Sequence, residues 1–191
     1  GASSSDDVAI SWFQDVRALR TAIHDDGDEV STHFAHGAFA PGPSDLWLVG
    51  AGGVAVHYDG TAAVQVPTPD LGEVRAVWGP SPASIYAVSS LGTEITVLHY
   101  DAAAKAFVGV RTLPSPATPT ALWGTDDDSF FVSTSSGEVY HLSKTAAVLA
   151  NPKSNYGINA LWGQGAAVYA VGDVRSGSIK RVASSVGEGS V

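Results

Sequence analysis

Short apolar runs alternate with turn residues along almost the whole chain, and a unit of three such runs recurs. The first run ends in an aromatic residue followed by a small one, as in Val77-Trp78-Gly79 and Leu122-Trp123-Gly124. A second, aromatic-rich run follows, and a third run ends in a basic residue. The aromatic residues that end the first runs are Phe39, Trp78, Trp123 and Trp162, and they follow one another at steps of 39, 45 and 39 residues. A period near 40 residues built from short strands predicts stacked β units, none of which can bury its faces alone.

Each repeat predicts a four-stranded antiparallel sheet. The predicted second strands begin at Asp45, Ser84, Ser129 and Val168. The third strands end in His57, His99, His141 and Arg181. Weaker apolar runs supply the fourth strands, at 62–66, 107–113, 146–150 and 182–186. Turns inside the repeats are expected to need a positive φ at Gly60, Gly92, Gly137 and Gly177.

Sheets of this kind repeated around an axis predict an all-β fold, a β-propeller of about five four-stranded blades in one domain. The expected blades are residues 1–34, 35–72, 73–117, 118–154 and 155–191. The first blade lacks its inner strand, because only 8–13 and 18–24 match the second and third strands. A helix over Trp12–Ile23 is the alternative, since its apolar spacing is near-helical. The Asp25-Asp26-Gly27 turn, which matches the turn at Gly60, favours strands.

The phrases Trp-Gly, Asp-Leu-Trp-Leu-Val-Gly at 45–50 and Val-His-Tyr-Asp-Gly at 56–60 resemble the repeat of exported bacterial β-propeller proteins of myxobacteria-like organisms. The resemblance covers about residues 8–182. It implies a propeller fold and a secreted or surface binding protein, and it names no ligand. Such propellers commonly carry more blades, so the chain is either a compact ring or a piece of a larger one.

Charge and composition narrow the function. The net charge is −9 with only 10 Lys and Arg, which argues against nucleic-acid partners and anionic membrane surfaces. No apolar run reaches 18 residues, so no membrane insertion is expected. The chain has no Cys, which excludes disulfides and thiolate chemistry, and no Met. With its Ser-rich opening, this predicts that an export signal or lipid-anchor segment was removed, and hence a secreted, periplasmic or cell-surface location.

The histidine series is the first candidate for chemistry. His24, His57, His99 and His141 share one repeat position, and converging imidazoles can ligate a metal. The favoured interpretation is structural. Third strands lie away from a propeller axis, so each ring is expected to bond to a nearby polar group instead. His33 and His36 form a separate local pair. No metal site and no cofactor are predicted.

The aromatic series is the second candidate. Its members can stack on sugar rings, but large rings also pack between blades, which is the favoured interpretation for most of them. Tyrosines in or beside turns keep the repeat phase less strictly and are expected to be exposed. The predicted ligand-binding residues are Tyr58, Tyr100, Tyr156, Trp123 and Trp162.

Carboxylates test for an enzyme, because glycoside hydrolysis needs two of them at one site. The predicted inner strands, such as Arg75–Trp78, carry no acid, and Glu73 precedes one of them without a partner. Asp126-Asp127-Asp128 is expected to be a solvated turn. No catalytic residue is predicted.

These patterns predict a non-catalytic binding module that recognises a protein or glycan through propeller rim loops. Two alternatives remain open. One is a lyase or hydrolase with an axial His/Asp site. The other is a propeller fragment that self-associates through its open blade faces; closure within one chain is the favoured arrangement.

Overall fold

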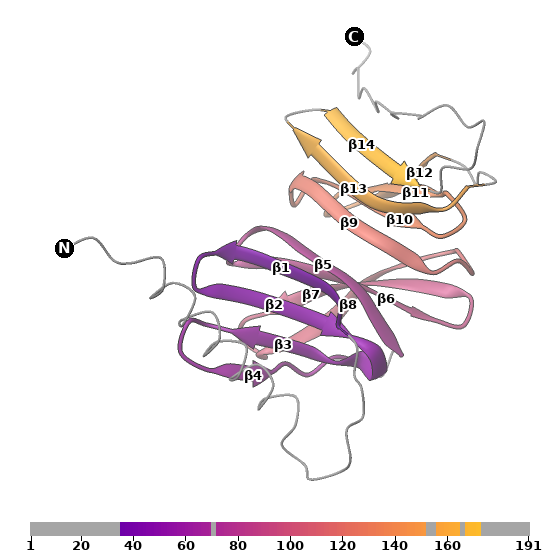
Figure 1. Ribbon diagram of the computed structural model, residues 1–191. Coiled ribbons are helices and arrows are strands. Elements are labelled where there is room, and N and C mark those ends of the chain that lie inside the picture. The colour runs from indigo at the N-terminus through magenta and orange to yellow at the C-terminus, as the bar shows by residue number, and fades with distance from the viewer. Residues whose placement is uncertain (1–34, 70–71, 152–155, 165–166, 173–191) are drawn as a thin grey trace.

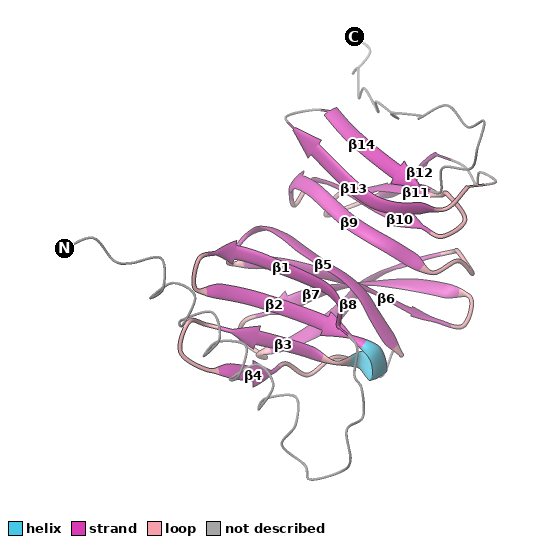
Figure 2. Cartoon of the chain, viewed as in Figure 1, coloured by secondary structure: helices cyan, strands magenta, loops and turns pink. Residues whose placement is uncertain are grey.

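The computed structural model describes residues 35–69, 72–151, 156–164 and 167–172 (Figure 1). Strands dominate this part of the chain, and one 3-10 turn at Ala51–Gly53 interrupts them (Figure 2). The all-β expectation is therefore confirmed. The predicted first blade, His24, His33, Gly177 and Arg181 lie outside the described residues.

Three four-stranded sheets and one two-stranded sheet follow one another along the chain, each a simple antiparallel meander. Sheet A contains β1 (Ala35–Gly42), β2 (Asp45–Gly50), β3 (Ala55–Tyr58) and β4 (Ala63–Gln65). Sheet B contains β5 (Glu73–Ser81), β6 (Ser84–Leu91), β7 (Glu94–Asp101) and β8 (Ala106–Leu113). Sheet C contains β9 (Pro119–Asp126), β10 (Ser129–Thr134), β11 (Val139–Leu142) and β12 (Ala147–Asn151). Sheet D contains β13 (Ile158–Gln164) and β14 (Ala167–Gly172).

The first strands bring consecutive sheets together. β1 contacts β5, β5 contacts β9, and β9 contacts β13, so the four first strands are neighbours in chain order (Figure 1). Second, third and fourth strands then extend each sheet outwards from this shared line. The arrangement is propeller-like, and each sheet comes from one sequence repeat.

Every sheet carries the same row of side chains across its strands. The register aligns Trp78 with Tyr86, Tyr86 with His99, and His99 with Val108. Sheets A and C repeat this row, and sheet D holds its first two members; these residues are Phe39, Trp47, His57 and Val64; Trp123, Phe131, His141 and Val148; and Trp162 and Tyr169. We call the side of each sheet that carries this row its ladder face, and the other side its reverse face.

The core lies between sheets, where each ladder face packs on the reverse face of the next sheet. Trp47 of sheet A meets Tyr100 and Phe107 of sheet B, with ring centroids 4.8 and 5.7 Å away. Tyr86 of sheet B meets Phe130 of sheet C at 4.7 Å. A third cluster joins the ladder face of sheet C to Ile158 and Val168 of sheet D. Each fully buried Val, Leu or Ile contributes about 1.5–3 kcal/mol, so a sheet gains most of its stability from its neighbours.

The turns between third and fourth strands share a side-chain cap. Asp59 accepts hydrogen bonds from the backbone N–H groups of Thr61 and Ala62, both at 2.9 Å. Asp101 caps the equivalent turn in sheet B, and Ser143 does so in sheet C. The amides of Ala62 and Thr61 hold the pKa of Asp59 below its usual value.

Gly60, Gly92 and Gly137 have φ values of 90°, 65° and 84°, which confirms the positive φ expected at these glycines.

The glycine of each Trp-Gly phrase has a steric role. A Cβ at Gly124 would lie 2.7 Å from the carbonyl oxygen of Ser129, and one at Gly79 would overlap the carbonyl oxygen of Ser84. In both hairpins the backbone of the second strand therefore occupies the space of a side chain. This close approach explains why a glycine follows the aromatic residue in sheets B and C.

Replacing Gly79 with Ala is expected to destabilise the protein by about 1–3 kcal/mol, because the added methyl group must displace the β6 backbone. Urea denaturation followed by tryptophan fluorescence measures the change. Gly109→Ala is the matched control, since its Cβ would meet Thr96 at an ordinary 3.5 Å. Equal losses for the two variants would contradict the steric role of Gly79.

Candidate functional site

The described ladder-face histidines each pack on an aromatic ring of the second strand and make a hydrogen bond through Nε2. In sheet A, the ring of His57 stacks on Trp47 with centroids 4.0 Å apart and planes 13° from parallel. Its Nε2 lies 2.9 Å from Oδ1 of Asp45, the first residue of β2. In sheet C, His141 stacks on Phe131 at 4.5 Å, and its Nε2 lies 3.1 Å from Oγ of Ser129. The structural interpretation of these two rings is confirmed.

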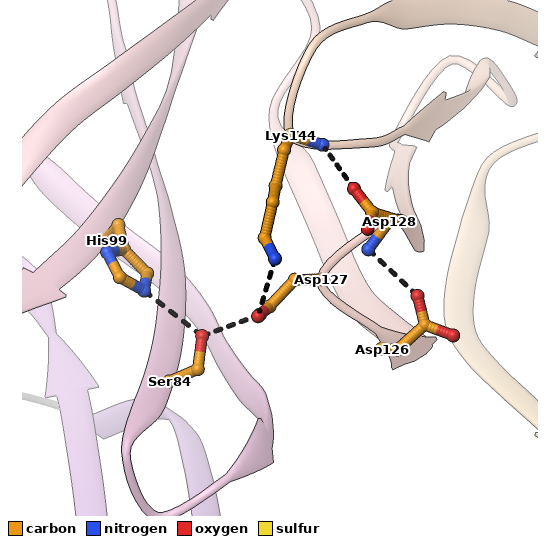
Figure 3. Close-up of polar contacts among 6 residues, drawn as sticks. All are labelled: Ser84, His99, Asp126, Asp127, Asp128 and Lys144. Atoms are coloured by element: carbon orange, nitrogen blue, oxygen red, sulfur yellow. Dashed lines mark hydrogen bonds and ion pairs between the residues drawn. The ribbon is translucent and has the colours of Figure 1, made fainter.

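In sheet B the same position joins a polar network between two sheets (Figure 3). Ser84 Oγ lies 3.1 Å from His99 Nε2 and donates a 2.6 Å hydrogen bond to Oδ1 of Asp127 in sheet C. Lys144 Nζ lies 3.5 Å from Oδ2 of Asp127. Strands β6 and β7 supply the serine and histidine, and the β9–β10 turn supplies the carboxylate.

The order of donors in this network differs from that of a hydrolytic triad. A serine hydroxyl has one proton, and here Ser84 gives it to Asp127. His99 Nε2 must therefore donate to Ser84, whereas a general base would accept the serine proton at this nitrogen. The network joins sheets B and C, and its donor order differs from that of an activated serine.

Burial and charge shift the pKa values of the network. Burial lowers the pKa of His99, while the charge of Asp127 acts in the opposite direction without overcoming it. Burial also raises the pKa of Tyr86, with a further contribution from Asp127. For Asp127 itself, burial acts to raise the pKa, but hydrogen bonds from Ser84 and Tyr86 and the charge of Lys144 together bring it below the usual value.

The interpretation of Asp126–Asp128 as a solvated turn is wrong for its middle residue. Asp127 crosses to the neighbouring sheet, as described above, and only 27 % of its side chain is exposed. Asp126 caps the turn by accepting a 2.8 Å hydrogen bond from the backbone N–H of Asp128. The middle carboxylate is therefore a structural group at a sheet interface.

The predicted ligand-binding aromatics lie on different sheets. Tyr100 sits edge-on against Trp47 and packs on the core between sheets A and B. Trp123, on β9, packs against the cores on both sides of sheet C. Tyr58 ends β3 and is half-buried. Tyr100 and Trp123 thus belong to the packing between sheets, and these three residues lie on three different sheets.

The other two predicted residues are the most exposed of the set. Trp162 on β13 is 59 % exposed, although it stacks on Tyr169 with centroids 5.3 Å apart. Tyr156, just before β13, is 49 % exposed. Both belong to the C-terminal part of the described chain.

A second polar group, which the sequence pattern did not single out, lies near the start of the first strands. In each first strand the pairing register shifts by one residue, which produces a β-bulge at the same place. The extra residue is polar in all four strands: His36, Arg75, Thr120 and Asn159. The residue after each bulge is small, and it is Gly37, Ala76, Ala121 or Ala160.

Close packing of neighbouring first strands requires these small residues. A Cβ at Gly37 would lie 3.1 Å from Cα of Ala76 and 3.2 Å from the carbonyl oxygen of Arg75. The backbones of β1 and β5 therefore come together next to the bulges. A polar residue three positions before the aromatic one, followed directly by Gly or Ala, is the sequence signal that marks this position.

The partner of Glu73 is a base and not a second acid. Glu73 is the first residue of β5, and its carboxylate forms an ion pair with the guanidinium of Arg75. His36 of sheet A lies 3.8 Å from the same carboxylate. The bulge in β5 brings Arg75 next to Glu73, a contact that residue spacing in a regular strand does not suggest.

Two features are absent from the described residues. They contain no group of three or more His, Asp or Glu side chains placed to hold a metal ion. None of the helical segments in this part of the chain has the length and apolarity needed to span a bilayer.

Comparisons with known proteins show a likeness of fold alone. No protein-family model matches the chain, and no curated protein matches it. It is similar to the crystal structure of the computationally designed Ika4 protein, with a TM-score of 0.59 and 13 % identity over 75 % of this chain and 88 % of that one. It is also similar to the designed Ika8 protein, with a TM-score of 0.52 and 14 % identity over 74 % of this chain and 44 % of that one. The chain thus spans less than half of Ika8.

The lowered pKa of His99 makes stability depend on pH. As the pH falls below 6.5, the unfolded chain takes up a proton at His99 before the folded chain does. The stability contributed by the neutral imidazole is therefore lost as the pH falls through the pKa of His99 in the folded chain. We expect the difference in unfolding free energy between wild type and His99→Gln to shrink from pH 7.5 to pH 5. Urea titrations across this range measure it.

The same substitution at His141, whose Nε2 bonds to Ser129 within sheet C, provides the control for losing a ladder-face imidazole. A wild-type advantage over His99→Gln that stays constant with pH would contradict the lowered pKa of His99.

Proposed function

We propose that the chain is a β-propeller of about five blades that acts as a non-catalytic binding module for a glycan or protein, exported to the cell surface or beyond it. Four consecutive sheets joined through their first strands support the propeller. The observation that carries the non-catalytic part of the proposal is the 2.6 Å hydrogen bond from Ser84 to Asp127 of the neighbouring sheet, which uses the serine proton in a contact between sheets. The most enzyme-like cluster of the described chain is thereby used for packing.

The two designed proteins add support for a repeating ring. The two alignments include nearly the same share of this chain, 75 % and 74 %. They include 88 % of Ika4 but only 44 % of Ika8. The second design is therefore about twice as long over the same matched fold. Equal matches to proteins of such different length are expected when an architecture grows by adding units.

An enzyme with an axial His/Asp site has less support. Among the described residues, the aspartates bonded to ladder-face groups, Asp45 and Asp127, lie where first strands turn into second strands. The described inner strands carry two acids at opposite strand ends: Glu73 begins β5 and is paired with Arg75, and Asp126 ends β9. Acid–base hydrolysis of a glycoside needs a second carboxylate close by.

The binding role is tested on a printed glycan array with fluorescently labelled protein. We expect saturable binding without turnover, and at least about a tenfold loss when Trp162 and Tyr156 are both replaced with Ala, because stacked aromatic faces carry much of sugar recognition. Val148→Ala is the control, since Val148 is equally exposed at 60 % and lies on an outer strand. Chemical conversion of a bound glycan would contradict a non-catalytic role.

One observation favours the second candidate, self-association through an open sheet face. Trp78 and Val88 on the ladder face of sheet B are 7 % and 0 % exposed, whereas the equivalent Trp162 and Val171 of sheet D are 59 % and 62 % exposed. An apolar face of this kind is covered by a reverse face wherever a next sheet is described. A second copy of the chain would offer the reverse face of its sheet A.

Solution mass separates this candidate from a monomeric binding module. The chain has a mass of 19.6 kDa, so end-to-face pairing is expected to give about twice that value or more at micromolar concentration in sedimentation equilibrium. Trp162→Glu is expected to restore the monomer, because it places a charge on the apolar face. Val148→Glu, on an outer strand, is expected to leave the mass unchanged. A monomeric wild type would rule out self-association.

A further inference from the structure

The polar residues at the four bulges have features of a recognition site. β-bulges turn a side chain out of the regular alternation of a strand, and they are frequent beside binding and active sites. Here the bulge recurs on four first strands that contact one another in sequence. The four extra residues thus lie at one level along the shared inner line of the sheets.

Solvent reaches this group. The side chains of His36, Glu73 and Arg75 are 23 %, 42 % and 32 % exposed. Thr120 is half-buried, and Asn159 is exposed. Thr120 Oγ1 lies 3.0 Å from Oγ of the buried Ser133, so its hydroxyl is partly used inside the sheet. Packing of the core does not account for the polar residues at the other three positions, since the small residue that follows each bulge already lets the strands approach.

The chemistry of the group combines donors and acceptors with little net charge. Arg75 donates, Glu73 accepts, and the hydroxyl, amide and imidazole of the other three can each do both. Arg75 Nε is buried and has no hydrogen-bond partner among the described residues. An unmet buried donor is costly, so a ligand oxygen that reached it after a small rotation of the guanidinium would be favoured.

We propose that His36, Glu73, Arg75, Thr120 and Asn159 form a binding site for a neutral saccharide. Adjacent hydroxyl groups of a sugar each donate and accept, so they complement a paired acid and base flanked by hydroxyl and amide groups. A neutral ligand also avoids repulsion from a chain with a net charge of −9, which an acidic glycan would experience. This inference rests on the glycan-binding arm of the proposed function and places the sugar at the inner strands.

The test titrates D-glucose, D-galactose and D-mannose into the whole chain by ligand-observed NMR, with D-glucuronate as the charged counterpart. We expect at least one neutral sugar to bind, and Arg75→Gln and Glu73→Gln each to weaken it at least about tenfold, since each removes a charge-assisted hydrogen bond. The affinity is expected to change less than twofold between 50 and 500 mM salt. Salt screens charges over a Debye length of roughly 8 Å at physiological ionic strength, which weakens the binding of charged ligands and leaves that of neutral ligands nearly unchanged.

Matched controls lie in the outer part of sheet B. Arg111→Gln removes a guanidinium that donates to the carbonyl of Lys144, and Glu94→Gln removes an exposed acid at the start of β7. Both are expected to bind the sugar like wild type. Thermal melts of Arg75→Gln and Glu73→Gln establish that these variants remain folded.

The outcomes separate this inference from the proposed function. Array binding that survives Arg75→Gln but is lost with the Trp162 and Tyr156 substitutions overturns the inner-strand site and leaves the binding module standing. Preference for glucuronate, or a strong loss of binding with salt, overturns the neutral ligand. Failure of wild type to bind any glycan on the array overturns both the glycan arm and this site.

Discussion

Packing of one sheet's ladder face on the next sheet's reverse face is the interaction on which this structure depends. A sheet of four short strands has too little buried area to be stable alone, and its two apolar faces must both be covered. Trp47 and Tyr86 show how this is done, since each inserts an aromatic ring into the following sheet. Because the covering surface always comes from the next repeat, the spacing of the repeats and the order of the sheets are coupled. The same requirement explains why first strands lie so close together, with Gly37 packed against the β5 backbone.

Much of this architecture could be predicted from the sequence, because periodic residues carry the packing. The recurrence of Trp78 and Trp123, each followed by glycine, located the first strands, and the histidines located the third strands. The structure adds the reason for the glycine, which is the close approach of the second-strand backbone to Gly79 and Gly124. Register shifts were beyond sequence reasoning. A bulge changes which residues face each other by a single position, and its signal here, a polar residue followed by Gly or Ala, is recognised only when the registers of the four first strands are compared.

The polar groups were predicted less well, for physical reasons that differ between them. The histidines were expected to bond locally, and His57 and His141 do so, because their partners lie directly across a hairpin. Asp127 was misjudged because its partner Ser84 lies 43 residues away on another sheet. The ion pair of Glu73 with Arg75 was not predicted, because the bulge at Arg75 alters the local geometry. The repeat position of an aromatic residue did not reveal whether it is buried or exposed. Trp123 lies between sheets, whereas Trp162, at the same repeat position, lies on an open face.

The ladder-face histidines of sheets A and B are linked to carboxylates in different ways. In sheet A it is Asp45 of the same sheet, whereas in sheet B, where the equivalent residue is Ser84, it is Asp127 of the neighbour. If sheet C were stacked directly on sheet A, Asp127 would meet Asp45, and two carboxylates would share one small, partly dehydrated space. Near-identical modules are therefore not interchangeable. The repulsion between Asp45 and Asp127 would oppose this mispaired stacking, whereas Ser84 offers Asp127 a hydroxyl donor in the native order.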